Sequence, residues 1–275
     1  GASEAPSEEA SGQELPAEAP PLEEPTLEQP ASEEPVVDVP AASPADFVPF
    51  GPGEEIVFDI SYGPVHAGEA SLKVRGIVDS RGVECYHVES TAQSSRFFSA
   101  FYKVRDKVVS HFGTDDLVSH YFSKRLHEGE YRKNVQVRFD QEGHKAVYKD
   151  GRVIDVAPRT HDILSAFYVV RTLPLPDGAA AHVTTHSSKK NYDLEVIVHG
   201  RETVEVPAGT FDCVKVEPVI LGEGLFQFEG QILIWLTDDE RRIPVLMKTK
   251  VKIGAVDASL TSYKPGKPLN RGEGS

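Results

Sequence analysis

The sequence is poor in the residues and motifs on which several large protein classes depend. Only two of its 275 residues are cysteine, so it lacks a disulfide framework. It has no run of about 18 apolar residues, and no membrane-spanning helix is therefore expected. It also lacks a phosphate-binding loop, a dinucleotide fingerprint and a Gly-x-Ser-x-Gly nucleophile elbow. The common signatures of nucleotide-dependent enzymes and serine hydrolases are thus missing.

Basic residues are absent from the first 46 positions, which contain 12 acidic residues and nine prolines. The formal net charge of the chain is −14, so removing these 12 charges leaves −2 for residues 47–275. That part lacks the basic balance of a nucleic-acid binder. Residues 1–46 cannot bury enough apolar surface to offset the entropy of ordering, and they are predicted to be a disordered acidic tether.

The tether and the Gly-Ala-Ser start, which has no Met, suggest an exported bacterial protein. We expect it in the periplasm or at the outer membrane of a Gram-negative cell. The tether would then be the spacer of a lipoprotein whose lipid anchor lies at the N-terminus. An ordinary disordered extension explains the same composition equally well.

One segment, residues 162–173, is predicted to be a buried helix. Asp162 can accept hydrogen bonds from the free amides of the first turn. Pro174 and Pro176 end the helix, because proline lacks the amide hydrogen. The residues between are almost all apolar, and a helix without a polar face is normally buried.

Most of the remaining chain alternates apolar and polar residues between turn signals, as half-buried strands do. Asp150-Gly151 is a typical hairpin turn. Strands are expected at 54–62, 66–78, 84–93, 102–112, 117–126, 130–139, 146–148, 153–154, 181–185, 192–198, 211–220, 226–236, 244–253 and 258–263. The predicted fold is all-β: a large antiparallel curved sheet or partly open barrel with one central helix. It forms a single domain over residues 47–264, followed by a flexible tail over residues 265–275.

Several short motifs, in this order, resemble the domain of unknown function 3108 family, which is found in exported bacterial proteins. The resemblance covers roughly residues 47–263. It implies a β-rich envelope domain without an assigned activity, and no catalytic residues follow from it. The motifs are Phe50-Gly-Pro-Gly-Glu54, Tyr62-Gly63, Ala67-Gly68, Glu128-Gly-Glu-Tyr131, Asp162-Ile-Leu-Ser-Ala-Phe-Tyr-Val-Val-Arg171, Pro207-Ala-Gly-Thr-Phe211, Ile234-Trp-Leu-Thr-Asp-Asp-Glu-Arg-Arg-Ile-Pro244 and Lys252-Ile-Gly254.

Polar residues offer few catalytic or metal-binding arrangements. His182 and His186 share a face only on a helix, whereas a strand is expected there, so no metal or cofactor is predicted. Glu128 and Glu130 lie on one strand face and are candidates for an acid–base pair. The neighbouring Lys and Arg residues favour a solvated ion-pair lattice instead. Cys85 and Cys213 are expected to be either two buried thiols or a long-range disulfide.

A ligand site is expected where the buried helix meets a group of aromatic residues. Arg171 ends the helix, where its charge suits the helix dipole; alternatively it holds an anionic group in a cavity. The candidate ligand-binding residues are Arg171, Tyr168, Phe97, Phe98, Phe101, Tyr102 and Trp235, with Phe226 and Phe228 nearby in the same aromatic set.

From these features we expect a non-catalytic envelope domain that binds an amphipathic component, such as a lipid or a lipid-linked glycan. The alternative is a scaffold that docks on another envelope protein. A hydrolase that uses Glu128 and Glu130 is the third hypothesis. No nucleic-acid partner is expected, and the membrane is contacted only through the possible N-terminal anchor.

Overall fold

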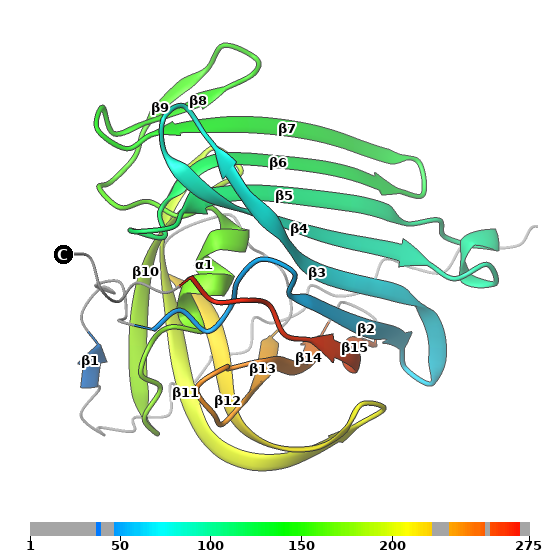
Figure 1. Ribbon diagram of the computed structural model, residues 1–275. Coiled ribbons are helices and arrows are strands. Elements are labelled where there is room, and N and C mark those ends of the chain that lie inside the picture. The colour runs from blue at the N-terminus through cyan, green and yellow to red at the C-terminus, as the bar shows by residue number, and fades with distance from the viewer. Residues whose placement is uncertain (1–36, 40–46, 222–230, 251–253, 270–275) are drawn as a thin grey trace, which may run out of the picture. The chain divides into compact units, whose positions relative to one another are not determined.

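The computed structural model describes residues 37–39, 47–221, 231–250 and 254–269. Most of the expected tether, the end of the C-terminal tail and the expected strand start at Phe226 lie outside these ranges. The described residues form strands β1–β15, a short 3₁₀ turn η1 and one α-helix, α1 (Figure 1). The helix spans Ile163–Val170 and η1 spans Phe98–Ala100.

Most strands fall on the alternating segments of the sequence, but β1 was not predicted and β11 extends well beyond its predicted end at Val198. Their bounds are β1 Val37–Val39, β2 Glu55–Tyr62, β3 Val65–Asp79, β4 Glu84–Ser94, β5 Arg105–Gly113, β6 Ser119–Glu128, β7 Tyr131–Asp140, β8 Lys145–Tyr148, β9 Val153–Asp155, β10 Ala179–Ser187, β11 Lys190–Val206, β12 Gly209–Leu221, β13 Ile232–Thr237, β14 Pro244–Lys250 and β15 Ala255–Lys264.

All strands belong to one sheet, with the order β1-β10-β11-β12-β13-β14-β15-β2-β3-β4-β5-β6-β7-β8-β9. Every pairing is antiparallel except β1 with β10. The two meanders β2–β9 and β10–β15 are joined where β15 pairs with β2, so the two halves of the chain share one continuous sheet. The predicted all-β fold with one large antiparallel sheet and a single helix is confirmed.

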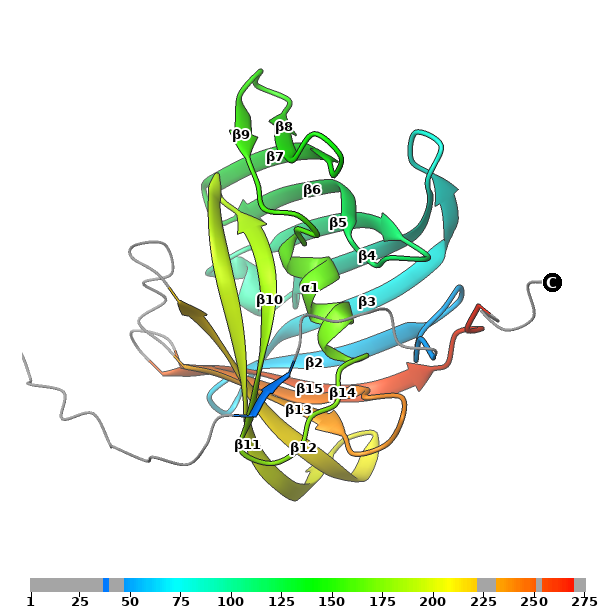
Figure 2. The ribbon, with the colours of Figure 1, turned by 90° about the vertical axis from the view of Figure 1, so that its left-hand side faces the viewer.

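The sheet is not closed by main-chain pairing, and side chains connect its two ends. The hydroxyl of Tyr148 on β8 lies 2.7 Å from Nε2 of His186 on β10. The side-chain amide of Asn191 on β11 donates to the carbonyl oxygen of Asp155 on β9 at 2.8 Å. These contacts hold the ends of the sheet together around α1, which lies on the concave side (Figure 2).

The helix is buried as predicted and is slightly shorter than expected. Its buried residues are Leu164, Ser165, Ala166, Tyr168, Val169 and Val170. It packs on β5 and β10, which belong to opposite halves of the sheet. In this way one short helix fills the concavity that the curved sheet creates.

Two short segments expected to be flexible make defined contacts. Val37–Val39, inside the expected tether, pairs with β10 as β1. Residues 265–269, inside the expected C-terminal tail, lie against the start of the domain, where the Lys267 amide donates to the Pro52 carbonyl oxygen at 3.0 Å. Leu269 packs against the main core. The sequence did not show these contacts because short segments carry too little periodicity. The predicted division into a tether, a domain over residues 47–264 and a tail stays a prediction.

Both cysteines are free and buried, so the pairing alternative is wrong. Burial raises the pKa of the Cys85 thiol to about 12 and that of Cys213 to about 11. We therefore expect neither thiol to react with a thiol-specific reagent in the native protein at mildly alkaline pH, because the thiolate is the nucleophile. Quantitative labelling with and without guanidinium checks this, since the denatured chain must label at both positions. Fast labelling of a thiol in the native protein would contradict it.

Candidate functional site

Two apolar cavities in the described part of the chain lie along α1. On one side of the helix a cavity of about 240 Å³ is bounded by β11, β12 and β13. On the other side a cavity of about 270 Å³ is bounded mainly by β2–β5 and β14. Ile163 and Phe167 line both cavities, so these two side chains lie between them. We call the two cavities together the α1 groove.

The lining of the α1 groove is almost entirely apolar. Phe58, Leu72, Val108 and Met247 are among the side chains on the β2–β5 side, where Ser71 and Ser90 are the polar residues. The other side is lined by Ile163, Phe167, Val170, Leu194, Val196, Val216, Pro218, Ile232, Ile234 and Leu236. Ile163 is 37% exposed, so the groove is accessible from solvent at the start of the helix.

A buried carboxylate fixes the N-terminal end of α1. Asp162 caps the helix as predicted, because its Oδ1 accepts from the amides of Leu164 at 2.9 Å and Ser165 at 3.1 Å. Its Oδ2 accepts from the hydroxyls of Ser110 on β5 at 2.6 Å and Ser119 on β6 at 2.5 Å. Burial raises the pKa of Asp162, and these hydrogen bonds act in the opposite direction. The cap therefore also ties the helix to the sheet.

A buried ion pair fixes the C-terminal end. Arg171 donates from Nη1 to Glu54 Oε1 at 2.7 Å and from Nη2 to Glu54 Oε2 at 2.9 Å, and neither side chain is exposed. The guanidinium also lies about 5 Å from the ring centroids of Phe50 (5.3 Å) and Tyr168 (5.1 Å). Burial tends to lower the pKa of Arg171, but the Glu54 carboxylate outweighs it and the net direction is upward. The charge of Arg171 is thus satisfied within the protein.

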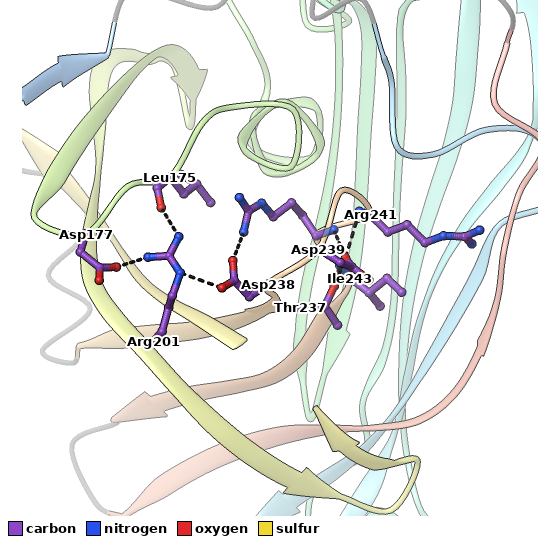
Figure 3. Close-up of polar contacts among 9 residues, drawn as sticks. Leu175, Asp177, Arg201, Thr237, Asp238, Asp239, Arg241 and Ile243 are labelled. Carbon is purple, nitrogen blue, oxygen red and sulfur yellow. Dashed lines mark hydrogen bonds and ion pairs between the residues drawn. The ribbon is translucent and has the colours of Figure 1, made fainter. Parts of the chain in front are cut away.

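The chain that leaves α1 is held by a second polar network (Figure 3). Arg201 on β11 donates to Asp238 at 2.7 Å, to the Leu175 carbonyl oxygen at 3.2 Å and to Asp177. Asp238 belongs to the β13–β14 turn, which also offers the Arg241 carbonyl oxygen to Arg171 at 3.2 Å. The charged segment 238–242 forms this turn. Both ends of α1 are therefore rigidly placed, and the groove beside the helix is a preformed feature.

The structure does not bring the seven predicted ligand-binding residues together. Arg171 and Tyr168 are buried in the core beside Glu54, so Arg171 is not free to hold a ligand. Trp235 is buried on β13 and donates to Glu202 at 2.6 Å. Phe97, Phe98, Phe101 and Tyr102 lie in or beside η1, with Phe98 half-buried and the other three exposed. Phe226 and Phe228 lie outside the described residues.

Sequence reasoning missed the two residues that divide the α1 groove. Ile163 and Phe167 were expected in the apolar helix, but the pattern did not show which side chains of the helix remain uncovered by the sheet. The spacing of four residues places them one above the other on one face. That face could have been singled out only with knowledge of which strands curve over the helix.

The acid–base alternative is not supported by the geometry. Glu130 is exposed in the β6–β7 turn, whereas Glu128 is half-buried and lies beside Asp106. Burial, followed by the hydrogen bond and charge of Asp106, raises the pKa of Glu128. The candidate Glu128–Glu130 acid–base pair is thus not supported. No group of three or more His, Cys, Asp or Glu side chains within the described ranges has a metal-binding arrangement.

Comparison with protein families gives a match to a family of unknown function. The model of DUF3108, described as a protein of unknown function, matches residues 57–261. A search of curated proteins gives no match. Among the described residues, no helix is both long enough and apolar enough to cross a membrane.

The solved structures that are similar to this chain have low sequence identity. A β-barrel-like protein of the DUF1849 family from Brucella abortus is 9% identical, with a TM-score of 0.52 over 78% of this chain and 98% of that one. A candidate exported protein with a YmcC-like fold from Bacteroides fragilis is 12% identical, with a TM-score of 0.34 over 80% and 100% of the two chains. A candidate lipoprotein from Parabacteroides distasonis is 12% identical, with a TM-score of 0.36 over 79% and 99%.

Proposed function

The chain belongs to the DUF3108 family, and we propose that it binds the acyl part of a lipid or lipid-linked glycan in the α1 groove. In this proposal it is a non-catalytic protein of the bacterial cell envelope. The observation that carries it is the groove itself, with its apolar lining and its solvent opening at Ile163. An apolar ligand that fills this groove removes apolar surface from water, which is favourable.

The size and rigidity of the groove support a chain-like ligand. Small-molecule sites usually have volumes of roughly 300–1,000 Å³, and the two cavities taken together fall in this range. Because Asp162 and Arg171 fix both ends of the helix, little ordering is needed on binding, and the entropic cost is low. The near absence of polar groups in the lining favours a hydrocarbon over a sugar or a nucleotide.

The envelope location rests on the acidic, proline-rich segment over residues 1–46, whose composition suits a spacer. Fractionation of the native host cell tests it directly. Recovery of the protein from the cytoplasmic fraction would contradict an envelope role. Such a result would leave the ligand proposal to be judged by binding alone.

The ligand proposal predicts that the purified protein binds cis-parinaric acid, a fluorescent fatty acid, saturably. An Ile163→Asp substitution should weaken this binding by about tenfold or more, because a carboxylate at the groove opening disfavours an apolar chain. Ile163 is the first residue of α1, where an acidic side chain suits the helix dipole, so the fold should be kept. Fluorescence titration of both proteins measures the ratio.

Val153→Asp is the matched control. Val153 is exposed on β9 and does not line the α1 groove, so the same chemical change should leave binding unaltered. An equal loss in both variants, or no saturable binding by the wild-type protein, would overturn the proposal. Native mass spectrometry with lipid extraction then identifies the natural ligand. If the mass spectrum shows the protein without a bound amphiphile, and added lipid does not change the thermal midpoint of unfolding, the scaffold hypothesis is favoured.

A further inference from the structure

A second surface, separate from the α1 groove, carries most of the exposed large hydrophobic side chains that the structure describes. Because β2–β7 form an antiparallel meander, the β2–β3, β4–β5 and β6–β7 connections lie at the same end of the sheet (Figure 1, right-hand side). Among the described residues, five of the eight exposed large hydrophobics belong to these three connections or adjoin them. They are Val65, Phe97, Phe101, Tyr102 and Tyr131. We call this surface the turn end.

The aromatic rings of the turn end are exposed, although hydrogen bonds hold the backbone of the residues that carry them. Phe97 and Phe101 are 68% and 78% exposed, with their rings edge to face at 5.6 Å. The Tyr102 amide donates to the Phe98 carbonyl oxygen at 2.8 Å. The Gly129 amide donates to the Lys103 carbonyl oxygen at 2.8 Å and so ties the β4–β5 and β6–β7 connections together. The exposed rings are therefore presented by a fixed scaffold.

A groove with several basic side chains adjoins these rings. Its volume is about 620 Å³, and its lining includes Arg96, Arg105, Lys107 and Arg125, with Glu69 and Asp106 as the acidic members. Lys107 pairs with Glu89 at 2.6 Å. Arg96, Arg105 and Arg125 make no ion pair with any residue that the structure describes. Three guanidinium groups are thus available to an anion.

We infer that the turn end docks on the surface of a membrane that contains anionic lipids. Aromatic residues lie preferentially at the membrane–water boundary, and Arg and Lys are attracted to the negative surface potential. The connection over residues 95–104 contains Arg96 and Lys103 and no acidic residue, whereas the whole chain has a net charge of −14. In the bound state Phe97 and Phe101 enter the boundary region, and the basic groove contacts lipid phosphate groups.

This contact differs from the lipid binding proposed for the α1 groove, because no residue named for the turn end lines that groove. The test uses the full chain without any lipid anchor and measures cosedimentation with vesicles. Vesicles of phosphatidylcholine alone are compared with vesicles that also contain phosphatidylglycerol. We expect binding only to the second kind, with a decrease as salt is added, since exposed charges are screened.

Two variants of the turn end should lose this binding. Arg96→Gln combined with Arg105→Gln should weaken it by about fivefold for each charge removed. Phe97→Ser combined with Phe101→Ser should reduce it by about tenfold or more, because two rings no longer leave water. All four side chains are exposed, so the thermal midpoint should not change.

The matched controls are Arg81→Gln, in the β3–β4 turn at the opposite end of the sheet, and Phe47→Ser; both residues are exposed and lie outside the turn end. They should bind vesicles like the wild-type protein, and so should Ile163→Asp. The proposal is overturned if the wild-type protein binds neither kind of vesicle, or if the turn-end variants bind as well as their controls. Cross-linking to an envelope protein that is lost in Phe97→Ser/Phe101→Ser, without vesicle binding, would assign the surface to a protein partner instead.

Discussion

Replacement of Arg171 by Met is expected to lower the free energy of unfolding by about 3–5 kcal/mol. The substitution leaves Glu54 as an unpaired carboxylate at a position where its side chain has no contact with solvent. It also removes two charge-assisted hydrogen bonds and the hydrogen bond to the Arg241 carbonyl oxygen. Methionine is unbranched and fills irregular core space, so the loss comes mainly from the stranded charge.

Chemical unfolding followed by circular dichroism measures this loss, and the double variant Glu54→Gln/Arg171→Met is its control. With both charges removed, no uncompensated ion remains buried, and much of the stability should return. The two single substitutions must therefore be strongly non-additive. If the double variant is as unstable as the sum of the single ones, the ion pair is not what holds the end of α1.

The strands and the helix could be predicted because their signals are local. Alternating burial along β2, with Ile56 and Phe58 inward, follows directly from the sequence pattern. The cap at Asp162 was likewise visible in the sequence, and the structure confirms it. The family could be predicted because the resemblance rests on ordered short motifs that the chain itself contains. The match of the DUF3108 model to residues 57–261 confirms this assignment.

The groove and the pairing of Arg171 could not be predicted because they depend on long-range geometry. Glu54 and Arg171 are 117 residues apart, and their contact exists only because the segment before β2 passes the end of α1. A basic residue at a helix end looks the same whether its partner is a ligand or a buried carboxylate. The exposed rings near η1 were likewise assigned to a ligand site, since aromatic content does not show which rings the sheet covers.

The β15–β2 pairing explains why local reasoning can give the strands and still miss the site. It joins β15, the last strand, to β2, the first strand of the β2–β9 meander. The pairing thereby determines which faces of the two halves enclose α1. Phe58 on β2 and Met247 on β14 line the same cavity as a result, although they are far apart in the sequence. A site built at such a junction has no signature within any one segment.

Replacement of Asp162 by Ala should destabilise the protein by about 3 kcal/mol or more. The change removes the helix cap, worth about 0.5–2 kcal/mol, and leaves the buried hydroxyls of Ser110 and Ser119 without their acceptor. The effect should exceed that of an ordinary exposed cap, because α1 also loses its connection to β5 and β6. Thermal and chemical unfolding measure it.

Asp162→Asn separates the roles of hydrogen bonding and charge at this position. Its carbonyl oxygen can still cap the helix, and the serine hydroxyls can rotate to accept from its amide, so the loss of stability should be well below that of Asp162→Ala.

Burial raises the pKa of Asp162 in the folded state, so folding favours the protonated form. The stabilising contribution from this titration is present below the unfolded pKa and is lost as the pH rises through the folded pKa. The asparagine variant should therefore lose this pH dependence. If it is as unstable as the alanine variant at every pH, the negative charge itself is required, and the end of α1 is held by electrostatics more than by the cap.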